Sequence, residues 1–145
     1  MSLPVMTAIR TALRKTLIGD GLLVSLLGGP RVYHRYLRKA AEIPSVTYFE
    51  STSHPERVIP RFEARVQIDV WDRTIDDAEL KAQRITQLLD LYEAADAGCA
   101  PFRVVTGEAN VLTMRLEAEY DDVAGESPTI ARKTLMFGLA AVQLA

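Results

Sequence analysis

The chain has few of the residues that support covalent or metal chemistry. Among its 145 residues there are one cysteine, Cys99, and two histidines, His34 and His54. One cysteine cannot form an internal disulfide bond, and no cysteine or histidine spacing matches a zinc site. A reactive thiol needs a nearby base, and neither histidine lies in a recognisable motif. We therefore expect no cofactor, no metal, and a reducing cytosol as the folding compartment.

The charge balance and the apolar runs argue against two further classes of protein. There are 17 basic and 19 acidic residues, whereas proteins that wrap nucleic acid usually have a strong basic excess. The apolar run 21–27 is much shorter than the ~20 residues that span a bilayer, and it lacks a cleavage site for a signal peptide. We therefore expect no membrane contact, no targeting segment and no general affinity for nucleic acid.

What the chain does contain is a clear pattern of strand and helix. Residues 61–71 alternate, with Ile68 on an apolar face and Arg65 and Asp69 on a wet face, which predicts a half-buried strand. Thr74 then provides a helix cap. The predicted buried stripe of this helix comprises Ala78, Ala82, Ile85, Leu89 and Tyr92. The positions predicted to lie outside the stripe are Asp76, Glu79, Lys81 and Arg84.

Further segments complete the predicted fold. An amphipathic helix begins near Pro4 and buries Ile9, and a short helix follows at 22–27. Strands are predicted at 43–50, 111–120 and 129–144, the last with Lys133 at its start. The inward side chains of the strand 111–120 are predicted to be Leu112, Met114, Leu116, Ala118 and Tyr120. The pattern predicts an α+β fold, a single domain over 1–145, with an antiparallel sheet covered on one face by amphipathic helices.

Carboxylate pairs are the remaining candidates for catalysis. Acid–base chemistry needs two carboxylates in different environments across a pocket, whereas these pairs lie on exposed faces and turns. No serine lies in a nucleophile elbow. We therefore assign no catalytic residue and predict that the chain is not an enzyme. The pairs are Asp76–Asp77, Glu117–Glu119 and Asp121–Asp122.

Two segments are candidates for contacts with other proteins. The polar segment 51–60 is too long for a simple hairpin turn, and long loops often carry function. The segment 31–38 mixes basic and aromatic residues. Such a mixture binds single-stranded nucleic acid or forms a partly exposed connection, and the overall charge favours the connection. The candidate contact residues are Arg31, Tyr33, Tyr36, Arg38, His54, Glu56 and Arg57.

The order of these motifs resembles a known family. A helix precedes the motif 29–33, and the strand motifs 43–48 and 64–71 flank a polar loop before the capped helix 76–91. This arrangement resembles the tail-terminator, or tail-completion, family of long non-contractile-tailed bacteriophages and prophages, which includes proteins like minor tail protein U. The likeness covers most of the chain and is most detailed up to Leu91. Its motifs are structural rather than catalytic.

The resemblance implies a structural protein of the virion. Proteins of this kind assemble as a ring, expected to be a homohexamer, on the finished tail tube. The ring ends polymerisation of the tube and forms the tail side of the head–tail joint. The implied partners are further copies of the chain, the major tail tube protein and the head–tail connector protein, while DNA passes through the lumen without specific binding. The implied location is the head-proximal end of the virion tail, after assembly in the host cytoplasm.

The residues alone leave two other classes open. One is another neck or head–tail connector protein of the same virion, and the other is a non-viral α+β module that binds a small molecule. The outward rows of mixed charge on the strands fit a solvated sheet face. They equally fit a face that meets a neighbouring subunit, where alternating signs set the register.

Overall fold

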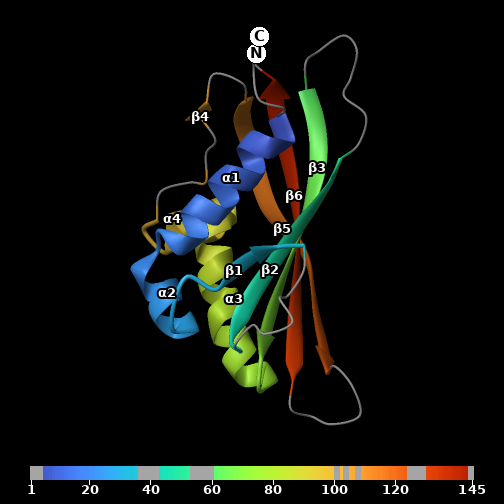
Figure 1. The fold of residues 1–145 in the computed structure, drawn as a ribbon. Coiled ribbons are helices and arrows are strands. Elements are labelled where there is room, and N and C mark those ends of the chain that lie inside the picture. Colours follow the sequence, from blue (N-terminus) through green and yellow to red (C-terminus); the bar gives the residue numbers. More distant parts are fainter. Residues whose placement is uncertain are drawn as a thin grey trace.

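The described residues form one mixed sheet with four helices on one of its faces (Figure 1). The α+β prediction, with amphipathic helices covering one face of a sheet, is therefore confirmed. A computed structural model describes residues 5–35, 43–52, 61–99, 102, 105–106, 109–123 and 130–143. The helices are α1 (Val5–Ile18), α2 (Gly21–Leu27), α3 (Ile75–Leu89) and α4 (Leu91–Asp96). The strands are β1 (Val32–His34), β2 (Ser45–Thr52), β3 (Arg61–Asp72), β4 (Val105–Thr106), β5 (Ala109–Val123) and β6 (Ala131–Gln143).

The sheet is organised around its two central strands. Its order is β1-β2-β3-β6-β5-β4, and the central pair β3–β6 is antiparallel with Val66 opposite Phe137 and Ile68 opposite Leu135. All pairs are antiparallel except β1–β2, which is parallel. The sequence did not predict β1, because three residues in a basic and aromatic segment give too short a run to show alternation.

One face of the sheet and the inner sides of the helices form the core. Ile9 of α1 and Ile85 of α3 have no exposed surface, and neither do Val66 and Ile68 of β3. The alternation of residues 61–71 therefore separates a core face from an outer face, as the sequence predicts. Burial of these side chains supplies most of the driving force for the layer packing.

A β-bulge changes the predicted orientation of one strand. Met114 and Leu116 of β5 face the core, but the register shifts between Leu116 and Ala118. The extra residue reverses the phase of the strand, so Glu119 lies opposite Leu135 on the helix side. The prediction that Tyr120 faces inward is therefore wrong, and its side chain is 59% exposed.

The helix predicted at 76–91, with Tyr92 in its buried stripe, is in fact two helices. Thr74 caps α3 as predicted, accepting a hydrogen bond from the amide of Asp77 at 3.1 Å. The helix then ends at Asp90, which has an extended backbone and caps α4. The chain changes direction there, so Tyr92 leaves the buried stripe and its predicted burial is wrong.

Several charged residues predicted to lie outside are buried. Lys81 is 7% exposed because its ammonium group lies 2.6 Å from the carboxylate of Asp72 at the end of β3. Asp69 is 5% exposed and accepts a 2.6 Å hydrogen bond from the hydroxyl of Thr134. Each pairing depends on residues distant in sequence, which a periodic pattern does not reveal.

An ion pair connects the helix pair α1–α2 to the helix pair α3–α4. Arg84 of α3 donates from Nη2 and Nε to the two carboxylate oxygens of Asp20, at 2.7 and 2.8 Å. Asp20 also caps α2 by accepting from the amide of Leu23. The bond from Arg84 is the main cause that lowers the pKa of Asp20 below its ordinary value of 3.8. Arg84, predicted as an outward residue, is therefore a tie between α2 and α3.

The Asp20–Arg84 bridge predicts a defined loss of stability in acid. A carboxylate with a lowered folded-state pKa stabilises the fold fully above its unfolded pKa, and that stabilisation is lost as pH falls through the folded pKa. We expect Asp20→Asn to lower the free energy of unfolding at neutral pH by about 1–2 kcal/mol. We also expect a weaker loss of stability below about pH 4 than in the wild type. Urea unfolding across pH measures both effects. Asp96→Asn, at an exposed position, is the control, and equal acid sensitivity of Asp20→Asn and wild type would contradict the prediction.

Candidate functional site

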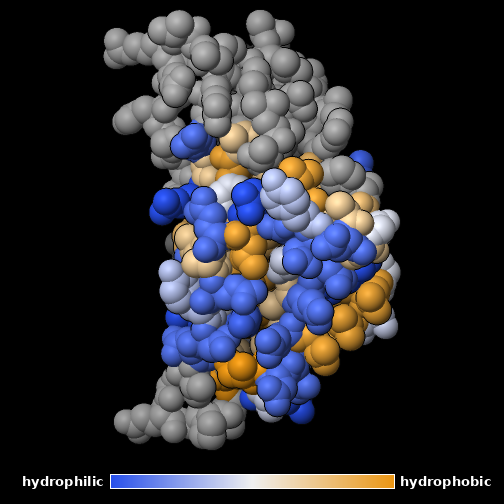
Figure 2. Space-filling view, turned by 180° about the vertical axis from the view of Figure 1, so that it is seen from behind, coloured by the Kyte–Doolittle hydropathy of each residue, from blue (hydrophilic) through white to orange (hydrophobic). Residues whose placement is uncertain are grey.

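A groove lies between the helix layer and the edge of the sheet. It separates α3 and α4 from β5 and β6 and has a volume of about 630 Å³. The surrounding surface is mostly hydrophilic, with separate hydrophobic patches (Figure 2). Its lining consists of Asp76, Glu79, Leu80, Ala82, Gln83, Thr86, Asp90, Tyr92, Glu93, Arg115, Leu116, Glu119 and Lys133.

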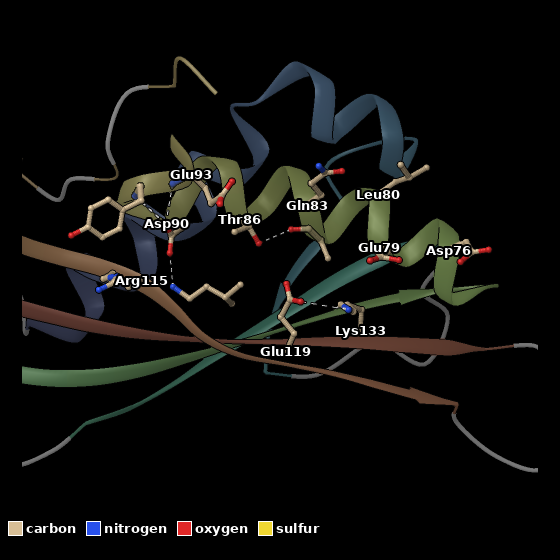
Figure 3. A pocket seen from close by; sticks show the side chains of 13 residues that line it. Asp76, Glu79, Leu80, Gln83, Thr86, Asp90, Glu93, Arg115, Glu119 and Lys133 are labelled. Carbon is tan, nitrogen blue, oxygen red and sulfur yellow. Dashed lines mark hydrogen bonds and ion pairs between the residues drawn. The ribbon is translucent and has the colours of Figure 1, made fainter. Parts of the chain in front are cut away.

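Asp90 fixes the geometry of the groove at its closed end. Its Oδ1 accepts from the amides of Tyr92 and Glu93, both at 3.0 Å, and so starts α4. Its Oδ2 accepts from the amide of Leu116 in β5 at 2.7 Å. Figure 3 shows this carboxylate between the helix and the strand. One buried side chain therefore sets the turn between the helices and holds it to the strand at its bulge.

The groove carries more negative than positive charge. Its lining includes five carboxylates, which belong to Asp76, Glu79, Asp90, Glu93 and Glu119, and two cations, Arg115 and Lys133. The ammonium group of Lys133 lies 2.8 Å from Asp121 and 3.9 Å from Glu119. Figure 3 shows the ion pair with Glu119.

The two cations are already engaged within the chain. The hydrogen bond with Asp121 is the main cause that raises the pKa of Lys133, which therefore stays charged at neutral pH. The guanidinium of Arg115 lies over the ring of Tyr92, 4.6 Å from its centroid. The acidic groups at the mouth, Asp76, Glu79 and Glu93, are exposed. The groove therefore presents a negative surface to anything that approaches it.

Two large apolar side chains border this acidic groove. Leu80 and Tyr92 are each 59% exposed, among the highest exposures of large hydrophobic residues in the described chain. Aromatic and aliphatic side chains at the border of a charged groove are typical of protein–protein contacts. The arrangement therefore offers a candidate surface for contacts with another protein.

A second charged cluster lies under α1 on the opposite side of the sheet centre. Glu50 of β2 accepts from Arg10 Nε at 2.8 Å and lies 3.0 Å from Nε2 of His34. Burial opposes ionisation of Glu50, but the bonds from Arg10 and His34 together lower its pKa. The ring of His34 packs against Tyr48, with centroids 5.2 Å apart. The cluster ties α1 to β1 and β2 and is mostly shielded from solvent.

The structure places only part of the predicted contact surface. Arg31 directly precedes β1 and Tyr33 is its middle residue. Both are partly buried and take part in interactions within the chain. The other candidate contact residues lie outside the described residues, so the two segments are not placed relative to each other. These residues are Tyr36, Arg38, His54, Glu56 and Arg57.

The groove itself was not predicted from the sequence. Its carboxylates come from α3, α4 and β5, and their convergence depends on the break at Asp90 and the bulge near Leu116. A usable signal was the acidic excess of the segments that form these elements. Within the described residues no group of three or more histidine, cysteine or carboxylate side chains could hold a metal ion. No helix among them is long and apolar enough to span a bilayer.

Comparisons with known proteins identify the family and the fold of the chain. The family profile of tail completion protein gp17 matches residues 11–118, from α1 into β5. A chain from the solved virion of a native gene transfer agent particle has a similar fold, with a TM-score of 0.76 and 16% sequence identity. The match covers 98% of this chain and 99% of that chain. No curated protein sequence matches the chain.

Because the family profile spans most of the sequence, the chain belongs to the tail completion protein gp17 family. The resemblance seen in the sequence is thereby confirmed. The protein therefore has a structural role in a phage tail and is a component of the virion.

Asp90 provides a direct test of the groove geometry. We expect Asp90→Ala to lower the free energy of unfolding by about 2 kcal/mol, because it removes a helix cap and takes away the acceptor of the partly buried amide of Leu116. Asp90→Asn, which keeps an oxygen acceptor, should lose less than Asp90→Ala. Thermal and urea unfolding measure the two differences. Equal stability of Asp90→Ala and wild type would show that the turn between α3 and α4 does not depend on this carboxylate.

Proposed function

We propose that this protein forms a homohexameric ring on the finished tail tube, ends polymerisation of the tube and provides the tail side of the head–tail joint. The observation that carries the proposal is the match to the tail completion family over residues 11–118. The ring consists of copies of one domain that spans 1–145. It sits at the head-proximal end of the tail, and assembly takes place in the host cytoplasm.

The surface of the protein supports a role in assembly rather than catalysis. The groove combines exposed acidic groups with the exposed Leu80 and Tyr92, a composition suited to protein contacts. We assign the protein no enzymatic activity and no cofactor. Its partners are further copies of the chain, the major tail tube protein and the head–tail connector protein.

The charge of the chain suits a ring through which DNA passes. A lumen that must let DNA slide should not hold its phosphates, and binding of phosphates needs clustered lysine and arginine. The net charge of −2 is consistent with passage without specific binding.

Two segments supply candidate contacts within this assembly. The segments 31–38 and 51–60 are proposed to contact the tail tube or the adjacent subunit. Both combine charged groups with side chains that concentrate binding energy, and long polar loops commonly carry such contacts. The residues proposed for these contacts are Arg31, Tyr33, Tyr36, Arg38, His54, Glu56 and Arg57.

Removal of the protein tests the proposed role directly. Particles assembled without it should carry tails of abnormal and variable length, because nothing stops addition of tube subunits. Purified protein added to such tubes should bind at one end and stop their growth, which electron microscopy of the tubes measures. Protein bound along the tube wall with bare ends would contradict capping. Tails of normal length that fail to join heads would instead indicate another connector protein.

Two substitutions test the contact segments separately from folding. Arg57→Glu and Tyr36→Ala should leave the melting temperature within about 2 °C of the wild type, because neither position belongs to a core stripe. Each should lower the yield of correctly ended tails severalfold, because each removes a side chain proposed to make a contact. Arg73→Ala, an exposed position between β3 and α3, is the matched control. Normal tail length and infectivity in both variants would remove these residues from the contact surface.

A further inference from the structure

Charge is divided between the two edges of the sheet. At the β1 edge, Arg14 of α1 donates to the main-chain oxygen of Val32 at 3.3 Å, which holds α1 beside β1. Lys15 on the same helix and Arg35 directly after β1 are exposed. The only acidic residue between positions 5 and 35 is Asp20, and Arg84 already binds it. This side of the molecule, here called the basic edge, is therefore positive.

The opposite edge is negative. The sheet order places β5 at the far side from β1, and the groove lies between β5 and the α3–α4 pair. Its exposed groups include Glu79, Glu93 and Glu119, with Leu80 and Tyr92 beside them. The charge of Lys133 is used internally by Asp121. An occupant of this groove must therefore bring positive charge together with some apolar surface.

We propose that the occupant is the basic edge of a second copy of this chain, so that neighbouring subunits pack with the groove of one copy against the α1–β1 side of the next. The inference rests on the proposed ring and specifies its contact surfaces. Charge complementarity carries it, because the positive and negative surfaces lie at opposite edges of one sheet. The apolar side chain of Leu22 in α2, 54% exposed on the same helical hairpin as Lys15, provides apolar surface to meet Leu80 and Tyr92.

This geometry explains how the chain could form a closed ring. A contact between two different surfaces leaves each copy with one surface still open, so it continues from copy to copy and closes when the rotation returns to the start. Like charges on the wrong surfaces oppose groove-to-groove and edge-to-edge pairing. The same two surfaces therefore set both the direction and the repetition of the assembly.

Charge reversal tests the contact on each surface separately. The groove-reversed variant is Glu79→Lys with Glu93→Lys, and the edge-reversed variant is Lys15→Glu with Arg35→Glu. All four positions are exposed, so both variants should fold, which circular dichroism and melting temperature verify. The control reverses charge elsewhere, at Asp96 by Asp96→Lys.

Each reversed variant should fail alone, and the two should succeed together. Either variant alone places like charges in the contact, and we expect its capping of tail tube ends to fall by about tenfold or more. An equimolar mixture restores opposite charges at every contact, because each copy of one variant meets only copies of the other. The mixture should therefore cap tubes and sediment as a heavier species than either variant alone. A chain with all four substitutions should also regain capping.

The outcomes separate this inference from the proposed function. Normal capping by both single-surface variants would overturn the contact while leaving the capping role in place. The groove-reversed variant could lose capping and fail to regain it when the edge-reversed variant is added. That result would assign the groove to another virion protein and would also overturn the contact. Failure of the wild type to cap tubes would refute the proposed function. Sedimentation of the mixed variants without tubes would then decide the contact: a heavier mixed species supports it, and no such species overturns it.

Discussion

The antiparallel pairing of β3 with β6 is the constraint on which the rest of the structure depends. The two strands pair from Arg61 to Asp72, and they join the β2–β3 and β5–β6 ladders into one sheet. Their register brings Val66 to Phe137 and Ile68 to Leu135 on the face that the helices cover. A slip of one residue would turn this face toward solvent, so packing of α1 and α3 and the register of the sheet stabilise each other.

Local patterns of the sequence predicted the parts of the fold that depend on nearby residues. Alternation located β3, and the cap at Thr74 located the start of α3. The errors come from contacts between distant residues. Lys81 is buried because it forms an ion pair with Asp72 at the end of β3. Asp90 ends α3, and its second carboxylate oxygen accepts a hydrogen bond from an amide of β5. Such pairings have no periodic signal, and the pairing of Asp90 with Leu116 lies in the lining of the groove.

The candidate site also divides into features that composition indicates and features that depend on contacts between distant residues. The contact residues were proposed from the composition of the segments 31–38 and 51–60. The groove, in contrast, depends on a helix break and a bulge that composition does not encode. The groove nevertheless has a compositional trace, because α3, α4 and β5 together hold nine of the 19 acidic residues while the α1–β1 region is basic. Net charge alone, at −2, hides this separation. The overall composition is ordinary, and the proposal of a role in assembly depends on the family match and the groove.

The bulged edge of β5 affects how readily two copies of the chain can pair strand to strand. Beyond Asn110 no described strand pairs with the outer side of β5, and such open edges invite strand-by-strand aggregation. Here two register shifts distort the ladder, Asp90 occupies the amide of Leu116, and the side chains of Glu117, Glu119 and Asp121 repel a second identical strand. An edge built in this way opposes strand pairing with a second copy, and it leaves contacts with other proteins to the side chains.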